Sequence, residues 1–549
     1  MKTRNTFWLI CSGVLFHMVD SALMHNQNVM KRCRCLTNEF NDNNIVGAQT
    51  VCNSKTNLRD FFRDREDLLK YEAETSFAAE IKLTDNEQLA NKIIMKAKED
   101  EFQAGLFQPH QFNPSRHIFE VLDAIKQSKL FQIIQKMPKG GILHTHDTAF
   151  CSISCVISLT YWSNLWQRTS INNSNDILEF VFSRDKPKKK PDDNDSSWRL
   201  VKDARSEIGA KKYDENLRKL FTLSDKNVNP RIQFKDANDA WNHLTGLFTK
   251  LEPILTYAPV LKAYYKHALT EMQADGVQYM EFRGLLTKLY DLDGNKYNEE
   301  DIMEMYVEAL DEFKRDNPSF IGSKFIYSPL KKKYNETIAK SFDIVRRLHA
   351  KFPQFLAGFD LVGQEDKAPA LVSFAEKILQ LPDDIKLFFH AGETAWFGSV
   401  DENLIDAVLL GSRRIGHGYA LAKHPKVIDL VKSNDIAVEV NPISNQVLKL
   451  IEDFRNHPAS VLMALNVPIV VSSDDPSFSE VLPLSHDFYI AFLGIASRHS
   501  DLRTLKKFAI NSIQYSSLND SEKTVAFAKW QVKWDTFIED VVQNQQKFK

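Results

Sequence analysis

The chain has 549 residues, of which 43% are hydrophobic and 26% are charged, an ordinary composition for a soluble globular protein with room for one large domain and additions. Its formal net charge is −2, from 70 basic and 72 acidic residues, so no overall positive field attracts nucleic acid or an anionic membrane. Composition therefore argues against a partner selected by net charge and identifies none.

The N-terminus has the pattern of a secretory signal peptide. Two basic residues precede an apolar run at residues 7–16, and a small-residue pair follows at Ser21 and Ala22. The run is much shorter than the roughly 20 apolar residues of a membrane-spanning helix, and no later segment is apolar enough to span a bilayer. We predict a signal peptide at residues 1–22, a secreted mature chain and no membrane span.

A secreted chain can form disulfides and carry glycans. The number of cysteines beyond the signal is odd, so at least one thiol is free or pairs between chains, and the sequence leaves the pairing open. These cysteines are Cys33, Cys35, Cys52, Cys151 and Cys155. The candidate glycan sites, each the start of an N-x-S/T sequon, are Asn172, Asn194, Asn335 and Asn519.

Residues 23–136 are predicted to form an N-terminal arm followed by helices. The arm, residues 26–57, is polar and rich in Asn and Thr. After it, apolar residues recur at three- and four-residue spacing, which is typical of amphipathic helices. The helical segments are residues 60–74, 85–102 and 117–136. Two roles stay open for them, packing against the main domain or forming a homodimer interface.

Strand-like runs then alternate with helical segments, which predicts a parallel sheet closed into a (β/α)8 TIM barrel over residues 137–549. The eight runs are residues 140–147, 277–285, 324–330, 355–363, 385–393, 413–418, 436–444 and 467–475. Titratable residues fall at the C-terminal end of the runs, where such a barrel has its active site. Two further helices, residues 502–515 and 522–543, are predicted to close the outer ring.

The first strand is followed by a polar segment, residues 158–224, that includes RDKPKKKPDDNDSS at residues 184–197. Proline, lysine and aspartate crowded together bury little surface, so we predict an irregular, exposed insertion. Its lysines are suited to a sulfated glycan or another polyanion on a cell surface. The aspartates beside them favour the plainer interpretation, a solvated charged loop.

Three histidines and an aspartate at strand ends predict a metal site. His144 and His146 are two residues apart in ILHTHD, so in a strand both side chains point to the same face. His390 and Asp474 end two later runs at the same mouth of the barrel. Three imidazoles and one carboxylate suit Zn²⁺ with one position left for water, whose pKa on zinc falls to about 7. The sequence therefore predicts a hydrolytic site.

The remaining candidates lie beside these ligands. Glu393, three residues after His390, can act as a general acid if burial raises its pKa, and His417 can orient or deprotonate the attacking water. Asp474 and Asp475 are adjacent, so one is expected on the metal and the next on the substrate. Gly363 leaves room for a planar ligand to approach the backbone. Each has a plainer interpretation, a solvated acid at the rim or a turn residue.

The motifs HTHD, DLVG, HAGET, RIGHG, NPISNQVL and SSDDP, in this order, resemble the adenosine deaminase superfamily. The signal peptide, the helical addition and the phrases MPKGGILHTHD and DLRTLKKFAINSIQYS resemble its secreted branch, the adenosine deaminase 2 or adenosine deaminase-related growth factor proteins. The resemblance spans the chain from about residue 58 onward.

The resemblance implies a role for each candidate. His144, His146, His390 and Asp474 match the zinc ligands. Glu393 matches the acid that protonates purine N1, and His417 the residue that positions the hydroxide. The implied substrate contacts are Asp475 at N7, the Gly363 backbone at N3, Asp147 at the ribose, and Trp241 and Trp396 as aromatic walls.

The implied reaction converts adenosine or 2'-deoxyadenosine to inosine or 2'-deoxyinosine and ammonia. The branch also implies a homodimer formed by the N-terminal helices and a growth-factor role through removal of extracellular adenosine. Two departures from the branch stand out. The insertion lacks the branch's usual cysteine pair, which weakens the expectation of a receptor or glycan there, and residues 288–301 lack the histidine expected to contact the substrate.

Other function classes fit less well. A ligand-like protein whose barrel is only a scaffold is not expected to keep every catalytic residue. An AMP deaminase needs Arg or Lys near the motifs to hold a phosphate, and no such cluster is present. The HxE and PCxxC pattern of cytosine and nucleic-acid deaminases is absent, so a polynucleotide substrate is not expected.

Overall fold

The computed structural model describes residues 57–170, 176–188, 195–331, 336–395, 398–544 and 546. The expected signal peptide, the polar arm up to residue 56, Trp396 and three of the sequons, Asn172, Asn194 and Asn335, lie outside the described residues. The chain divides into two units, Met1–Thr75 and Ser76–Lys549.

In the first unit the described residues form helix α2 (Leu58–Thr75), which confirms the first predicted helix. No residue of α2 is buried. Its large apolar side chains include Phe61 and Leu68, which are 52% and 54% exposed.

The second unit begins with helices α3 (Asp85–Phe107), α4 (Ile118–Gln127) and α5 (Lys129–Lys136). A capping box starts α3, because the Thr84 side chain accepts from the backbone N–H of Glu87 while the Glu87 carboxylate accepts from that of Thr84. The sequence pattern predicts one helix over residues 117–136, but the structure has two. Ser128 separates them, and its hydroxyl accepts a hydrogen bond from the Phe131 N–H at 3.0 Å, so it begins a new helix instead of continuing the old one.

The predicted eight-stranded parallel barrel is confirmed. Its strands are β1 (Gly140–Ile142), β5 (Val277–Gly284), β8 (Gly322–Tyr327), β9 (Leu356–Phe359), β10 (His390–Ala391), β11 (Arg414–His417), β12 (Ala437–Val440) and β13 (Ile469–Val471). They form two parallel four-stranded ladders in chain order, β1-β5-β8-β9 and β10-β11-β12-β13. Parallel bridges join the ladders, Phe359 to Leu387 on one side and Thr145 to Asp474 on the other, so the ring closes.

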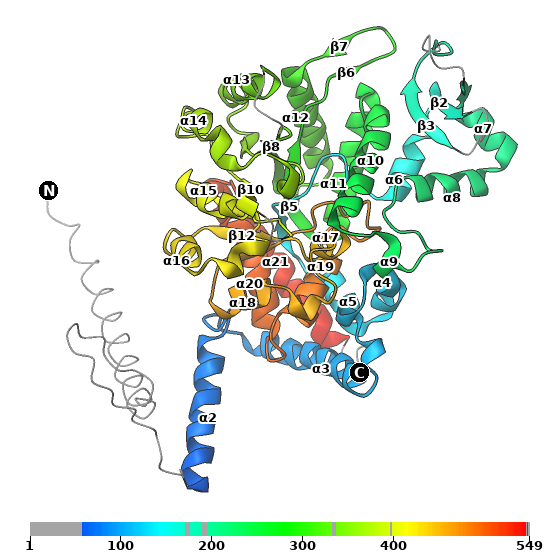
Figure 1. Cartoon of the computed structure of the whole chain (residues 1–549). Helices are drawn as coiled ribbons and strands as arrows, with labels where there is room; N and C mark the ends of the chain where they lie inside the picture. Colours follow the sequence, from blue (N-terminus) through cyan, green and yellow to red (C-terminus); the bar gives the residue numbers. More distant parts are fainter. Residues whose placement is uncertain are drawn as a thin grey trace. The chain divides into compact units, whose positions relative to one another are not determined.

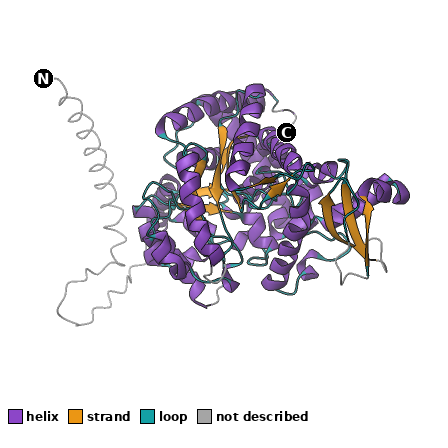
Figure 2. Cartoon of the chain, turned by 90° about the horizontal axis from the view of Figure 1, so that it is seen from above, coloured by secondary structure: helices purple, strands orange, loops and turns teal. Residues whose placement is uncertain are grey.

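Helices surround these strands, as Figure 2 shows. After β1 come α9 (Pro230–Gln233), α10 (Ala237–Leu255) and α11 (Ala258–Ala274). The strand pair β6 (Leu289–Tyr290) and β7 (Lys296–Tyr297) and helix α12 (Glu299–Asp316) follow β5. The helices after the next four barrel strands are α13 (Glu336–Lys351), α14 (Ala375–Ile378), α15 (Asn403–Leu409) and α16 (Pro425–Ser433); Figure 1 shows these four one below another beside the strands.

The last strands are followed by α17 (Pro442–Val447) and α18 (Ala459–Ala464), then α19 (Ser485–Ile490), α20 (Leu502–Gln514) and α21 (Asp520–Gln543). Helices α20 and α21 confirm the two helices predicted to close the ring. Every residue of β5 is buried, as expected for a parallel strand with side chains on one face in the barrel and on the other against helices.

The segment after β1 is more ordered than the sequence indicates. It contains α6 (Ile153–Leu159), an antiparallel sheet of β2 (Leu165–Ser170), β3 (Ile177–Phe182) and β4 (Ser196–Leu200), and helices α7 (Val201–Ile208) and α8 (Ala210–Leu220). Figure 1 shows β2 and β3 grouped with α7 and α8. Its apolar side chains, such as Phe180 and Leu217, are 1% and 0% exposed. The prediction of an irregular insertion is therefore wrong over these elements.

Cys151 and Cys155, just before the insertion, form a disulfide. Among the described residues, no helix has the length and apolar character needed to cross a membrane.

Candidate active site

The candidate metal ligands lie together at the C-terminal ends of the barrel strands. His144 and His146 follow β1, His390 begins the short β10, and Asp474 follows β13. The bridge between Thr145 and Asp474 places the end of β13 beside the His144/His146 pair. Parallel strands thus bring residues more than 300 positions apart in the chain to one point.

One ligand atom from each of these four residues lies within 4.8 Å of the others. The His146 Nε2 is 3.1 Å and the His144 Nε2 is 3.4 Å from the Asp474 Oδ1. His144, His390 and Asp474 are buried and His146 is partly exposed. The sequence prediction that these four side chains converge agrees with this geometry.

The donor atoms fit a metal ion. The His144 Nε2 is buried and has no hydrogen-bond partner among the described residues, while its Nδ1 is 2.7 Å from the Glu439 Oε2. The His390 Nδ1 is 2.6 Å from the Asp360 Oδ2, and burial lowers the pKa of His390 to about 3, so the ring is neutral at physiological pH. Neutral imidazoles oriented by carboxylates are the form in which histidine binds metals.

A buried network of ion pairs holds those carboxylates. Arg283 reaches the Asp360 Oδ2 and the Glu439 Oε2, each at 2.8 Å, and Arg414 contacts Glu439 and also Glu281, the latter at 2.7 Å. Burial opposes ionisation of Glu439, but the two guanidinium groups hold its pKa well below the usual range. The site therefore rests on charges that stay ionised inside the barrel.

Sequence reasoning did not find these supporting residues. Arg283 and Glu439 are charged residues within runs that are otherwise mainly apolar, VQYMEFRGL and IAVEVNPIS. A charge inside a buried strand is rare unless it is paired. The presence of these charged residues within apolar runs was therefore the sequence signal that could have indicated a buried ion-pair network. The partner of each charge lies on another strand, which one sequence does not reveal.

Glu393 lies beside the metal ligands in a water-poor setting. Burial, followed by the negative charges of Asp474 and Glu365, raises the pKa of Glu393 well above its usual value. Its Oε1 is buried and has no hydrogen-bond partner among the described residues, and Glu365 accepts a hydrogen bond from its backbone N–H. This is the direction of pKa shift that the sequence analysis required of a general acid.

His417 completes this side of the site. Its Nδ1 is 3.4 Å from the Glu393 Oε1, and its Nε2 is 3.7 Å from the Asp474 Oδ2 and has no hydrogen-bond partner among the described residues. Burial holds the pKa of His417 well below its usual value, so the ring is neutral. His417 and Asp474 both have left-handed backbone, with φ of +61° and +60°, which residues other than glycine rarely adopt.

A cavity of about 280 Å³ opens from the ligands towards α10. Trp241, Gly363 and Asp475 line it, as the sequence analysis predicted for substrate contacts. The Asp475 Oδ1 is buried without a hydrogen-bond partner among the described residues, and burial, followed by the charge of Asp474, raises its pKa well above the usual value. None of the described lining residues is a lysine or an arginine.

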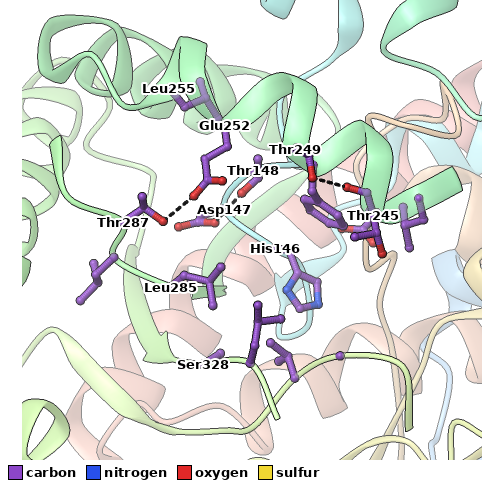
Figure 3. A pocket seen from close by; sticks show the side chains of 18 of the residues that line it. His146, Asp147, Thr148, Thr245, Thr249, Glu252, Leu255, Leu285, Thr287 and Ser328 are labelled. Carbon is purple, nitrogen blue, oxygen red and sulfur yellow. Dashed lines mark hydrogen bonds between the residues drawn. The ribbon is translucent and has the colours of Figure 1, made fainter. Parts of the chain in front are cut away.

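Asp147 lies in the same cavity, between His146 and α10 (Figure 3). Its backbone N–H donates to the Arg283 carbonyl at 2.8 Å, and Thr148 donates to its Oδ1 at 3.0 Å. Burial raises the pKa of Asp147 to about 6. Gly284 makes room for this side chain, because a Cβ there would lie 2.2 Å from the Asp147 Oδ2.

A closed parallel barrel with three histidines and an aspartate at the C-terminal ends of its strands defines an enzyme of the amidohydrolase type. The solved structures agree on this fold: an N6-methyl-AMP deaminase from Arabidopsis superposes with a TM-score of 0.51 at 15% identity, over 73% of this chain and 99% of the other. An amidohydrolase from Burkholderia ambifaria with bound Zn gives a TM-score of 0.50 at 20% identity, over 75% and 95%.

Sequence comparisons identify the family. The family model for adenosine deaminase matches residues 207–529, and that for the N-terminal region of adenosine and AMP deaminases matches residues 44–134. An adenosine deaminase from Lutzomyia longipalpis is 52% identical over 90% of this chain and 98% of its own. Human adenosine deaminase 2 is 38% identical over 87% and 93%.

The chain belongs to the adenosine deaminase family, in its adenosine deaminase 2 and growth-factor-related branch, and its enzyme activity is that of an adenosine deaminase. The resemblance stated from the motifs is thereby confirmed.

Proposed function

We propose that the protein is a secreted, zinc-dependent adenosine deaminase that converts adenosine and 2'-deoxyadenosine to inosine and 2'-deoxyinosine plus ammonia. The observation that carries the proposal is the meeting of four side chains that could hold a metal ion with a buried glutamate whose pKa is raised well above its usual value, all at one cavity. His144, His146, His390 and Asp474 would hold the ion. When bound, zinc would make hydroxide available from water near neutral pH.

The other residues are assigned to substrate chemistry. Glu393 donates its proton to purine N1, which makes C6 more electrophilic towards the attacking oxygen. His417 orients the attacking water, takes up its proton and passes it to the amino group, which leaves C6 as ammonia. The remaining proton of the attacking oxygen returns to the Glu393 carboxylate as the C6 carbonyl forms. Asp475 contacts N7, the Gly363 backbone N–H contacts N3, and Trp241 packs beside the nucleoside. Trp396 is assigned the same packing role from the motif resemblance alone.

A nucleoside suits this cavity better than a nucleotide. The cavity lining is largely apolar, its polar side chains are mainly carboxylates and hydroxyls, and none of the described lining residues is a lysine or an arginine. A 5'-phosphate would lack a cationic partner there. This supports adenosine over AMP, although the N-terminal family model covers deaminases of both.

Secretion is supported by the signal-peptide pattern at residues 1–22, with Asn519 and the other sequons as glycan candidates. The exposed apolar face of α2 supports a homodimer through N-terminal helices. The growth-factor role follows if the protein acts by lowering extracellular adenosine. A cell-surface glycan or receptor at the insertion is the remaining partner in this proposal.

The direct test is to mix the purified protein with adenosine and follow conversion to inosine by ultraviolet absorbance. We expect turnover that a zinc chelator abolishes and zinc restores. Turnover that persists after zinc is shown to be gone would contradict the zinc assignment.

A second experiment separates the enzymatic from the ligand account of growth-factor activity. The Glu393→Gln variant keeps the shape of the side chain but has no carboxyl proton to donate, so we expect bound zinc, a native fold and at least about 100-fold lower turnover. If mitogenic activity disappears with turnover, removal of adenosine is its cause. If the variant still stimulates growth, the protein acts as a ligand.

A further inference from the structure

The far end of the cavity contains a second carboxylate that neither the motifs nor the family resemblance assigns. Glu252 belongs to α10 and lines the same cavity as His390 and Glu393. Figure 3 shows the carboxylates of Glu252 and Asp147 pointing toward one another, on the side of Asp147 away from His146. The metal end and this acidic end are thus opposite parts of one cavity.

Glu252 is held in place from the other side of the cavity. The Thr287 hydroxyl donates to the Glu252 Oε1 at 2.7 Å. Thr287 lies in the loop after β5, next to Leu286, whose left-handed φ of +53° sets the turn of that loop. The hydrogen bond links α10 to the barrel, and it leaves the Glu252 Oε2 as an acceptor without a hydrogen-bond partner among the described residues.

The chemistry of this end disfavours an anion and favours a ligand rich in hydrogen-bond donors. Two carboxylates close together repel an anion, and their oxygens accept hydrogen bonds from hydroxyl groups. In the proposed function the purine occupies the end with Glu393 and Asp475, so the sugar extends towards α10. A ribose presents two adjacent hydroxyls, at C2' and C3', to the two carboxylates.

We propose that Glu252 is a specificity-determining residue of the sugar subsite, where it and Asp147 each accept a hydrogen bond from one hydroxyl of the ribose 2',3'-diol. The segment after β5, residues 288–301, has no histidine for this task. The acceptor comes from α10 instead, positioned by Thr287. The inference rests on the proposed function, because that function sets which end of the cavity holds the purine.

The test compares the Glu252→Ala enzyme with wild type on adenosine, 2',3'-dideoxyadenosine and 5'-deoxyadenosine. Wild type is expected to prefer adenosine over the dideoxy nucleoside in kcat/KM, and the variant to lose about 10- to 100-fold of that preference, mainly through KM. The preference between adenosine and 5'-deoxyadenosine is expected to stay unchanged. Thr287→Val, which frees the Glu252 carboxylate to move, is expected to give a smaller loss in the same direction.

The matched control is Glu308→Gln, which neutralises an exposed carboxylate on α12 that pairs with Lys262 at 3.5 Å and does not line the cavity. It is expected to keep the wild-type preference. Unaltered discrimination against the dideoxy nucleoside in Glu252→Ala, in a protein with wild-type zinc content and melting temperature, overturns the inference. So does a loss confined to 5'-deoxyadenosine. If wild type fails to deaminate adenosine at all, it is the proposed function that fails.

Discussion

His457 is a buried histidine next to the site, and its ring is neutral in the folded protein. The His457 Nδ1 accepts a hydrogen bond from the Ala459 N–H at 3.0 Å, and its Nε2 is 3.0 Å from the Asn445 Oδ1. The Asn445 amide in turn lies 3.3 Å from the His417 Nδ1. Asn445 thereby links His457 to His417, and a proton on the His457 Nδ1 would break the first of these contacts.

This arrangement predicts a pH dependence of stability. Burial lowers the pKa of His457 from 6.5 to about 3, so between those values the unfolded chain binds more protons than the folded one. The contribution of His457 to the free energy of unfolding is therefore fully present above pH 6.5 and is lost as the pH falls towards 3. The His457→Asn variant keeps an acceptor but does not titrate. As the pH is lowered below 6.5, we expect its free energy of unfolding to decrease less steeply than that of wild type, with slopes that differ by up to about 1.4 kcal/mol per pH unit.

Urea denaturation of both proteins at several pH values between 4 and 7 measures this difference. Equal slopes for the variant and wild type would contradict the assignment of a neutral, buried His457.

Strands and helices differ in how much their own sequence reveals. Most of the eight barrel strands could be predicted because they are short apolar runs with polar residues at the end, as in IKLFFHAGE and VPIVVSSDD. The ligands His144, His146, His390 and Asp474 could be placed at one mouth because parallel strands share an edge.

Other elements were missed for physical reasons. The strand β2, LWQRTS, has four polar residues out of six, so the segment resembles a loop although its side chains alternate between buried and half-buried. The break at Ser128 depends on a local cap that apolar periodicity does not register. Asp360 and Glu439 were missed because their importance comes from contacts between strands.

The strand-borne carboxylates predict a change in metal affinity. In Glu439→Gln the His144 Nδ1 loses a charged partner, so the ring is less well oriented and less basic. We expect zinc to bind about 10- to 100-fold more weakly, as measured by competition with a chromophoric chelator. The control is Glu376→Gln on the exposed side of α14, which should bind zinc as wild type does.

The Glu439 variant also leaves Arg283 and Arg414 less well compensated, so folding is checked by circular dichroism before titration. Asp360→Asn, which affects His390 in the same way, is the second variant. Wild-type zinc affinity in both folded variants would show that these carboxylates do not tune the site.

Helix α2 predicts the oligomeric state. Phe61 and Leu68 are seven residues apart and so lie on one face, as do Phe62 and Leu69, and all four are more than half exposed. An apolar stripe of this kind is stabilised when a second copy covers it. We expect the double variant Phe61→Asp and Leu68→Asp to be monomeric where wild type is a dimer, by light scattering after gel filtration.

The control for α2 replaces Lys70 and Glu74, exposed charged residues on the opposite face of the same helix, by alanine. An unchanged dimer in the aspartate variant would place the interface elsewhere in the chain.

On the scale of the whole molecule, the ring is closed by side chains that also form the site. Between β13 and β1 the described contact is the bridge of Thr145 with Asp474, reinforced by the Thr145 hydroxyl, which donates to the Asp474 carbonyl at 2.8 Å. The proposed metal ligands come from β1, β10 and the end of β13, so one ion would tie together the beginning, middle and end of the barrel.

Metal removal is therefore expected to destabilise the whole unit. A ligand that binds only the folded state adds stability in proportion to the logarithm of its concentration over its Kd. We expect a chelator to lower the Tm by about 5 °C or more in scanning calorimetry, with recovery when zinc is restored. An unshifted Tm in protein shown to be metal-free would contradict a structural contribution of the ion.

The left-handed backbone at His417 and Asp474 brings two requirements into conflict, an unstrained backbone and a polar side chain at the same position. Holding a non-glycine residue in this conformation costs of the order of 1–3 kcal/mol, and glycine, which would remove that burden, brings neither an imidazole nor a carboxylate. Under the proposed function, glycine at either turn would relieve the backbone and abolish turnover, so greater heat resistance has to come from other parts of the chain.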